Sequence, residues 1–287
     1  MTGTRLDEDF TSSVHVYEPH RAGLPRLRPY VRELWRRREF AGELSRTTMR
    51  SAHTNTVFGQ LWLVINPLLL AAVYYVLVTI LRGGAGPDAA ERFVHLCAGL
   101  FAFYFFSGAM QTGASSVVGG GKLLLNTSFP RLLLPLSAVR TAFFRFLPTM
   151  VVYIPIHVAF GQPLRWEMLI GVAFLAMLTI FGAGMAMIFA TLQVYFRDTA
   201  SFLPYLVRIW LYLSPVLWFP EDAPARYVDL MIINPLYSLL GGWTDLLVRG
   251  DIPALSLWIG GALWSLAAVV VGSLFFMSRE REFVVRL

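Results

Sequence analysis

Long runs of apolar residues without charged side chains dominate the sequence. A helix needs about 20 apolar residues to cross roughly 30 Å of hydrocarbon. Four uncharged runs are long enough, at residues 61–81, 93–118, 168–196 and 252–278. Two further runs of similar character contain arginine, at 135–160 and 201–219. The pattern predicts an all-α integral membrane protein with six transmembrane helices.

Placing an arginine in hydrocarbon costs free energy, so the arginines inside the predicted helices are candidate functional residues. Arg140 and Arg145 lie in the first half of the third helix, from which long side chains can extend to the lipid headgroups. Arg208 lies deeper in the fifth helix, where it faces a cavity or bonds backbone carbonyls or Asp198. No Asp or Glu lies deep in a predicted helix, which argues against a proton-coupled carrier built on a buried carboxylate.

The distribution of Lys and Arg predicts the orientation of these helices. The first fifty residues lack the apolar core of a signal peptide, so we expect the amino terminus to stay in the cytoplasm. In this topology 16 of the 24 Lys and Arg residues lie inside and 5 outside, in keeping with the positive-inside rule. Both termini are therefore expected in the cytoplasm. Most of the net charge of +6 precedes the first helix and faces anionic lipid, so nucleic acid is disfavoured as a partner.

The amino-terminal region changes character at Pro29. The residues before it are polar and show no helical period. After it, Tyr30 and Leu34 fall on one helical face and Arg36 on the other, which is typical of a helix in the membrane interface or against a soluble partner. The predicted regions are a flexible cytoplasmic tail at 1–28, a cytoplasmic interface-helix region at 29–56 and a six-helix transmembrane domain at 57–287.

A short cytoplasmic segment is predicted between the second and third helices. Three consecutive glycines end the second helix at Gly121, and a partly apolar stretch follows. It either docks a partner protein or is a simple connector. Its GGGK sequence is no phosphate-binding loop, because Ser116 and Leu123 stand where that motif needs Gly and Ser or Thr. The candidate docking residues are Lys122, Leu123, Leu124, Leu125 and Arg131.

The stretch from 220 to 251 is long and only partly polar. Its uncharged core at 230–244 is apolar but has fifteen residues, too few to cross the bilayer. Helix-breaking pairs interrupt it, so we expect one or two short helices that enter the outer leaflet and return. This re-entrant segment between the fifth and sixth helices is a candidate outer gate, with the residues Asn234, Pro235, Gly241 and Gly242.

Aromatic residues make up 14% of the chain, and several are clustered within predicted helices. Such residues usually face lipid or belong to interfacial belts. Alternatively, their ring faces line a channel along which sugars slide through weak, repeated contacts. The candidate channel residues are Tyr104, Phe105, Phe106, Trp210, Tyr212 and Trp218.

Groups that carry catalysis are scarce. His95 and His157 occur singly within predicted helices, and the one cysteine, Cys97, allows neither a disulfide nor a cysteine metal site. No nucleophile elbow or His-Glu-x-x-His motif is present. We therefore expect a transport subunit without a metal or cofactor of its own. The alternative from another functional class is a polyprenyl-dependent membrane glycosyltransferase. The sequence lacks the catalytic carboxylates and the metal site that such an enzyme would need.

Four short motifs occur along the predicted helices. They are Phe58-Gly59-Gln60-Leu61-Trp62 with Asn66-Pro67, Phe196-Arg197-Asp198, Ser214-Pro215-Val216 and Asn234-Pro235-Leu236. In this order and topology they resemble the motifs of the ABC-2 type permeases that export polysaccharides and teichoic acids. The resemblance runs from about Arg32 to the carboxy terminus. Phe58 departs from the leucine common at that position in the family.

The resemblance implies how such a chain is assembled. Two permease chains form the pathway, and two separate ABC ATPase chains bind ATP and Mg²⁺ and drive it. The segment from Lys122 to Arg131 then contains the coupling helix that docks the ATPase, the helix from Pro29 is the interface helix, and 220–249 holds the gate helices.

The resemblance also implies a substrate class, namely glycans attached to a polyprenyl diphosphate carrier. The diphosphate, or anionic membrane lipid, would be received by Arg46, Arg50 and Arg145. All but one of the basic residues are Arg, a bias expected of a GC-rich genome. The specific hypothesis is export of the galactan precursor of an actinobacterial cell wall. O-antigen, wall teichoic acid, or a drug or lipid carried by another ABC-2 exporter are the alternatives.

Overall fold

The computed structural model describes residues 23–51, 58–81, 88–127, 129–222 and 231–287. Within these ranges every regular element is helical, which confirms the all-α prediction. Most of the tail predicted at 1–28 lies outside the described residues, as does part of the predicted gate segment, at 223–230.

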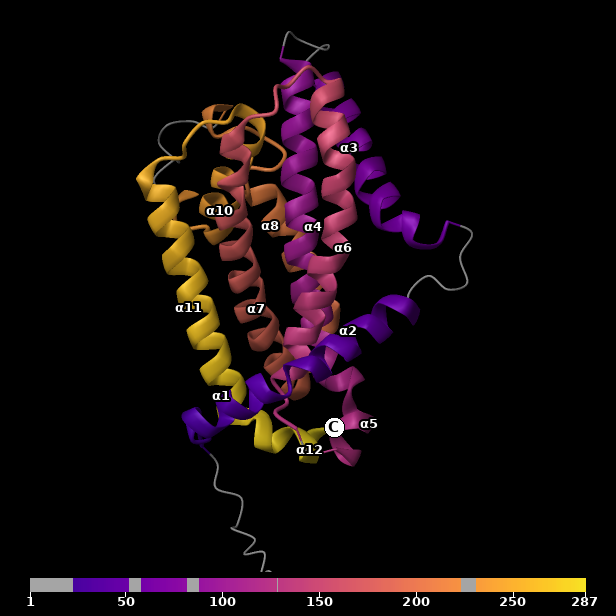
Figure 1. Cartoon of the computed structure of the whole chain (residues 1–287), viewed down its shortest axis with the longest axis vertical. Helices are drawn as coiled ribbons and strands as arrows, with labels where there is room; N and C mark the ends of the chain where they lie inside the picture. The colour runs from indigo at the N-terminus through magenta and orange to yellow at the C-terminus, as the bar shows by residue number, and fades with distance from the viewer. Residues whose placement is uncertain (1–22, 52–57, 82–87, 128, 223–230) are drawn as a thin grey trace, which may run out of the picture.

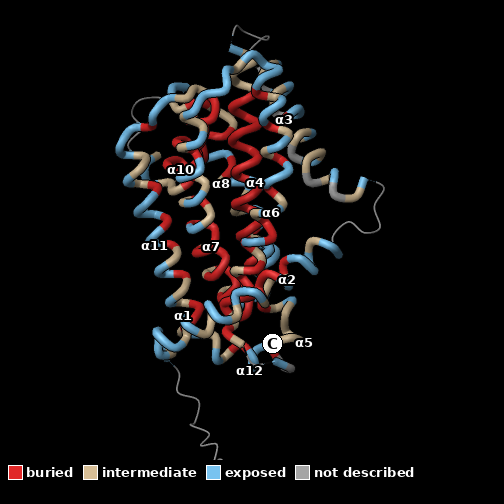
Figure 2. The backbone as a smooth tube through the Cα atoms, viewed as in Figure 1, coloured by how far each residue is buried: buried red, intermediate tan, exposed pale blue. Residues whose placement is uncertain are grey.

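Four long helices form the body of the molecule (Figure 1). The central helix α4 packs between α6 and α7, and α7 packs along α11. Figure 2 shows α4 as the most continuously buried of them. The four are α4 (Ala89–Gly119), α6 (Leu133–Ala159), α7 (Gly171–Tyr195) and α11 (Leu255–Arg279).

Shorter helices surround this body. Helix α3 (Trp62–Leu81) follows the 3-10 turn η1 (Gly59–Leu61) and contacts α4 and α6. Figure 1 shows that α3 runs from the side of the bundle up to the end where α4 begins. The remaining elements are α1 (Leu27–Arg36), α2 (Arg38–Ser51), α5 (Gly121–Asn126), η2 (Trp166–Leu169), α8 (Thr199–Leu213), η3 (Pro220–Asp222), α10 (Pro235–Thr244), the π-helix η5 (Asp245–Arg249), η6 (Glu280–Glu282) and α12 (Phe283–Arg286).

The described residues contain four helices that are long and apolar enough to cross a membrane, α4, α6, α7 with η2, and α11 with its carboxy-terminal extension. They correspond to the second, third, fourth and sixth predicted spans. The first predicted span is helical as α3. The fifth differs from the prediction over 201–219, because α8 ends at Leu213 after 15 residues and the Ser214-Pro215 pair turns the chain.

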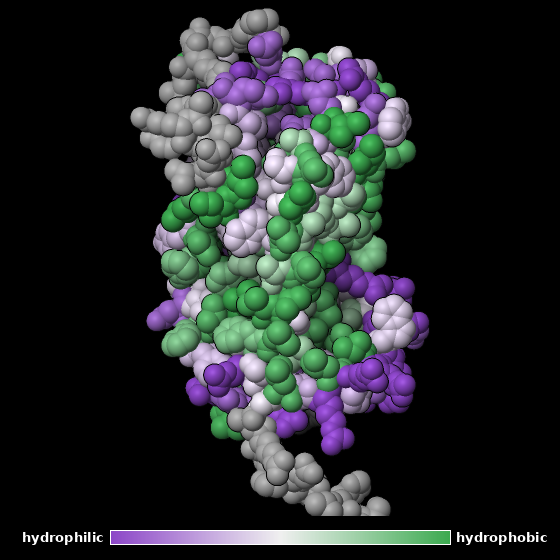
Figure 3. Space-filling view, turned by 90° about the vertical axis from the view of Figure 1, so that its left-hand side faces the viewer, coloured by the Kyte–Doolittle hydropathy of each residue, from purple (hydrophilic) through white to green (hydrophobic). Residues whose placement is uncertain are grey.

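The two ends of the bundle differ from its middle. We call the end at which α4 begins the upper end and the end at which α4 stops the lower end, as drawn in Figure 1. On the face shown in Figure 3, hydrophobic side chains form a broad band between hydrophilic ends. This distribution matches a protein that spans a bilayer with its ends in water.

Helices α7 and α11 approach each other most closely at small residues. A Cβ atom at Gly184 would overlap the backbone of Ala268, and a Cβ atom at Gly272 would overlap the carbonyl of Gly184. Ala268 and Gly272 are one helical turn apart, so they present one small-residue face to α7. Within lipid such close backbone packing is a principal source of helix association, because hydrophobic exclusion from water no longer acts there.

Replacing Gly184 by alanine should therefore separate the two helices. We expect Gly184→Ala to lower the free energy of unfolding by about 1–3 kcal/mol, as overpacked cores do. Gly182→Ala is the matched control, because a Cβ there would lie 3.7 Å from Ala109 and Phe106, an ordinary contact. Equal stability of the two variants in detergent unfolding would contradict the close crossing.

Candidate functional site

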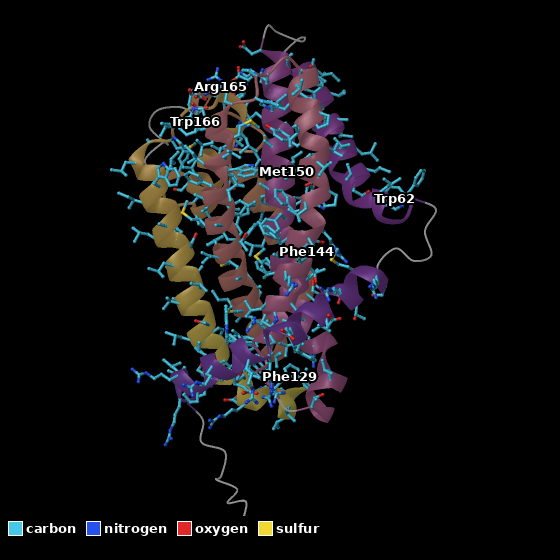
Figure 4. The ribbon with its side chains drawn as sticks, viewed as in Figure 1. Trp62, Phe129, Phe144, Met150, Arg165 and Trp166 are labelled. Carbon is cyan, nitrogen blue, oxygen red and sulfur yellow. The ribbon has the colours of Figure 1, made fainter. Side chains whose placement is uncertain are left out.

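A cavity of about 240 Å³ lies between α3, α4 and α6. Figure 4 shows Trp62 at the first turn of α3, on the side of the bundle. The cavity is lined by Trp62, Asn66, Phe101, Tyr104, Phe105, Gly108, Thr112, Ala142, Arg145, Phe146 and Thr149. It therefore combines aromatic rings with an amide, three hydroxyls and one cation.

The inner wall of this cavity is apolar and closely packed. Phe101, Phe105 and Phe146 are buried, and the rings of Phe105 and Phe146 lie 5.3 Å apart between centroids. Behind Phe146 stands Trp243 of α10, whose indole N–H donates to the carbonyl of Ala98 at 3.1 Å. The wall is thus held by three helices and cannot easily collapse.

Arg145 and Arg140 are on the same helix but have different surroundings. The Arg140 guanidinium lies over the ring of Phe144, 5.5 Å from its centroid, and against Gly42 of α2. Arg145 is half-buried and lines the cavity, and it has no hydrogen bond or ion pair within the part of the chain that the structure describes. Arg208 is exposed on α8, and no bond joins it to Asp198.

The six predicted channel aromatics occupy three places. Tyr104 and Phe105 line the cavity. Phe106 is fully buried and packs against Phe181 and Trp210, with centroids 5.4 and 5.6 Å away. Tyr212 is exposed near the end of α8, and the indole N–H of Trp218 donates to its carbonyl at 3.1 Å. Their role as a channel lining stays a prediction.

Asn234 joins α8 to α10. Its side-chain oxygen accepts from the amide of Leu236, capping α10, and from the indole N–H of Trp210 at 2.9 Å. Its amide donates to the carbonyl of Leu213 at 3.0 Å and to the hydroxyl of Ser214. Asparagine followed by proline is a favoured helix start, because Pro235 has no N–H to satisfy. The Asn234 side chain therefore satisfies backbone groups at the end of α8 and at the start of α10.

The two candidate gate glycines differ in their surroundings. A Cβ atom at Gly242 would overlap the ring of Phe174, whereas one at Gly241 would lie 3.8 Å from Pro215. Gly242 thus lets α10 pack directly on α7. Whether this segment opens as a gate stays a prediction.

An ion-pair network at the upper end ties this segment to α4. Arg249 pairs with Glu91 at 2.7 Å and with Glu221 at 2.5 Å. Arg92 pairs with Asp222 at 3.0 Å, and both guanidinium groups lie over the ring of Phe219, at 4.8 Å for Arg92 and 4.7 Å for Arg249. Partial burial disfavours the ionised form of Glu221, but the hydrogen bond from Arg249 prevails and lowers the pKa of that carboxyl.

No local sequence pattern predicts this network. Arg249 lies 158 residues after Glu91, and Asp222 lies 130 residues after Arg92, so only the packing of distant segments brings these pairs together.

The candidate docking residues lie at the lower end. Helix α5 packs against α12, and Figure 1 shows α1 and the carboxy terminus at the same end. Leu123 is half-buried and Leu124 is buried, while the side chains of Lys122 and Leu125 lie outside the described part of the structure.

Arg131 lies near an anchor of α1. The Tyr30 hydroxyl donates to the Glu280 carboxylate at 2.6 Å. Burial and the nearby carboxylate raise the pKa of Tyr30. Burial lowers the pKa of Arg131, an effect that Glu280 and Tyr30 oppose. The helix predicted from Pro29 is present as α1 and is fixed to the end of α11.

The three candidate phosphate-binding arginines lie on two elements. Arg46 pairs with Glu43 at 2.6 Å on the exposed face of α2, and Arg50 is exposed one turn further on. Only Arg145 lines the cavity. Among the described residues, no group of three or more His, Cys, Asp or Glu could hold a metal ion.

Comparison with known proteins shows which permeases the chain is similar to. No family model matches the chain. An O-antigen export system permease protein RfbA of Klebsiella pneumoniae is 29% identical over 203 residues, covering 70% of this chain and 77% of that protein. An RfbA permease of Myxococcus xanthus is 26% identical over 257 residues, covering 88% of this chain and 97% of that protein. The resemblance to ABC-2 type polysaccharide-export permeases is confirmed.

A second RfbA permease of Klebsiella pneumoniae is 28% identical to this permease over 205 residues. The relatives are permeases rather than enzymes, in keeping with a transport subunit. The match to the Myxococcus protein covers most of both chains.

Replacing Arg249 should remove the ion pairs that hold the upper end together and so lower the stability of the permease. We expect Arg249→Gln to lower the free energy of unfolding by about 1–2 kcal/mol at pH 7, through two partly exposed ion pairs and one cation–π contact. Arg165→Gln is the control. This nearby arginine is exposed and has no ion pair among the described residues (Figure 4).

The effect of Arg249→Gln should depend on pH. Because the folded-state pKa of Glu221 is below its ordinary value of 4.5, the pair stabilises the protein above that pH and is lost as the pH falls through the folded pKa. The difference between wild type and Arg249→Gln should therefore shrink from pH 7 to pH 3. A constant difference would contradict the ionic contribution.

Proposed function

We propose that this permease is the transmembrane subunit of an ATP-driven transporter that exports a polyprenyl-diphosphate-linked polysaccharide across the cytoplasmic membrane. The observation that carries the proposal is the similarity to O-antigen export permeases, which extends over 88% of this chain in one case. The apolar band between two hydrophilic ends (Figure 3) supports a membrane-spanning role.

The working transporter contains two copies of this chain and two copies of a separate ABC ATPase, which binds ATP and Mg²⁺. The ATPase docks at the lower end, where α1, α5 and α12 gather (Figure 1). This end faces the cytoplasm of the bacterium, and both termini lie there. The asymmetry of Lys and Arg along the sequence supports that orientation.

We propose a general class for the exported glycan and one specific candidate within reach of the same chemistry. Export of an O-antigen-type polysaccharide is favoured by what the three relatives are named for. The galactan precursor of an actinobacterial cell wall is the more specific candidate, supported by the near absence of lysine. Both arrive on the same kind of lipid carrier, so the diphosphate chemistry of the site is common to them. Arg46 and Arg50, exposed on α2, would meet the carrier first.

The path of the glycan runs from the lower end past the aromatic residues to the upper end, where α10 and the segment before it form the gate. Ring faces bind sugars weakly, which permits sliding rather than capture. The network around Arg249 and Phe219 would hold the gate segment closed between transport events.

Depletion of the permease in its host tests the export function. Lipid-linked glycan should accumulate on the cytoplasmic face of the membrane, because synthesis continues while export stops. The measurement is the fraction of glycan that an impermeant lectin labels on intact cells, compared with lysed cells. Complementation with the wild-type gene should restore labelling. An unchanged fraction would refute the proposal.

A charged residue on α5 tests the docking surface. Leu123→Glu should abolish co-purification of the ATPase, because the introduced carboxylate must be desolvated in the interface. It should leave the thermal stability of the permease nearly unchanged, since Leu123 is only half-buried.

Leu124→Glu provides the contrast. Leu124 is 6% exposed, so a carboxylate there should lower the stability of the permease itself. A complex that forms normally with Leu123→Glu would exclude α5 as the docking helix.

A further inference from the structure

The cavity between α3, α4 and α6 contains a cation and no acid. Arg145 keeps its charge under all physiological conditions and offers five N–H donors. Its polar neighbours in the lining are neutral: Asn66, Tyr104, Thr112 and Thr149. A guanidinium withdrawn from bulk water without an acid beside it costs free energy that an anionic ligand recovers. The charge of the lining therefore favours an anion.

The three arginines within the predicted membrane helices differ in their surroundings. Arg140, nearer the lower end, is held over Phe144 and against Gly42. Arg208 is exposed on α8 and does not line the cavity. Of these three arginines, Arg145 is the one that lines the cavity together with aromatic residues. The combination, rather than the charge by itself, distinguishes the site.

The uncharged part of the lining suits a sugar. Trp62 offers a large ring face, and its ring is held by an edge contact with Phe58 at 5.5 Å. Asn66 has no hydrogen bond within the described residues, so its amide can both donate and accept. The hydroxyls of Thr112 and Thr149 donate to carbonyls of their own helices, which leaves their oxygens free to accept from sugar hydroxyls. Apolar ring faces together with such groups match the two sides of a sugar ring.

The size of the cavity limits the ligand. Its volume of about 240 Å³ is below the roughly 300–1,000 Å³ of common ligand pockets. It can take a phosphate and one sugar, but not a length of polymer. The outward side of α3 is apolar, with Leu69, Val73 and Leu77 exposed, so a lipid tail could stay in the bilayer beside the cavity.

We propose, on the basis of the export function above, that this cavity binds the junction of a lipid-linked glycan, with its phosphate on Arg145 and its first sugar on Trp62. The site recognises the carrier-linked end of the substrate, whatever polymer follows. It thereby distinguishes a loaded carrier from ordinary phospholipid, which has the phosphate but not the sugar.

Binding to the purified permease in phosphatidylcholine nanodiscs tests the assignment without ATP or the ATPase. Three probes are compared by thermophoresis: a polyprenyl diphosphate carrying one hexose, the same diphosphate without sugar, and phosphatidylglycerol. Arg145→Gln should weaken both diphosphate probes by about tenfold or more, as loss of a charge-assisted bond does. Trp62→Leu should weaken only the probe that carries the sugar.

Two further variants keep the test decisive. Arg208→Gln removes an exposed arginine outside the cavity and should leave binding of all three probes unchanged. Arg145→Lys keeps the charge but not the planar fork, and should retain part of the diphosphate affinity. If Arg145→Gln binds like wild type, or if phosphatidylglycerol binds as tightly and with the same dependence on Arg145, the assignment is overturned.

The site and the export function can fail separately. Loss of probe binding in Arg145→Gln, with unchanged glycan distribution after depletion, would refute the function and leave the site standing. Export that stops on depletion, with probe binding indifferent to Arg145 and Trp62, would refute only the site.

Discussion

Polar groups that leave water must find partners inside the protein, and this requirement governs the molecule from its helices to its connections. The long helices satisfy their own backbones. Where α8 ends, the Asn234 side chain donates to the carbonyl of Leu213 and to the hydroxyl of Ser214, and it accepts from the amide of Leu236. Among the buried side-chain atoms that the structure describes, the hydroxyl of Ser238 is the one without a partner. Against this background Arg145, which has no acceptor among the described residues, lies where we propose that a ligand binds.

Close packing determines where the helices meet and where they do not. Small residues let α7 and α11 come into backbone contact at Gly184 and Gly272, and α4 is enclosed by its neighbours along most of its length. Helix α3 packs against α4 and α6, and the cavity lies between these three helices. The closely packed part of the bundle thus forms the inner wall of the candidate site.

The two ends of the molecule are held together by different contacts. At the upper end, arginines and carboxylates fix the segment after α8 to α4, through contacts that can break and re-form in water. At the lower end, the amphipathic α1 is bonded to the carboxy-terminal turn through Tyr30 and Glu280, next to the helix that would receive the ATPase. The long helices α4, α6, α7 and α11 connect the two ends.

The sequence by itself determined the chemistry of each segment. The length of the uncharged runs predicted the long helices, and the helical spacing of apolar and basic residues predicted the amphipathic α1. Four short motifs indicated the family resemblance. All of these signals are local, because periodicity and composition act within a few helical turns. The sequence could not show that α8 ends at Leu213, because the turn at Ser214 and Pro215 depends on the bonds from Asn234 twenty residues later. Nor could it pair Arg249 with Glu91, or bring Arg145 and Trp62 to one cavity. Those juxtapositions arise only when helices distant in sequence pack side by side, which is a property of the tertiary structure alone.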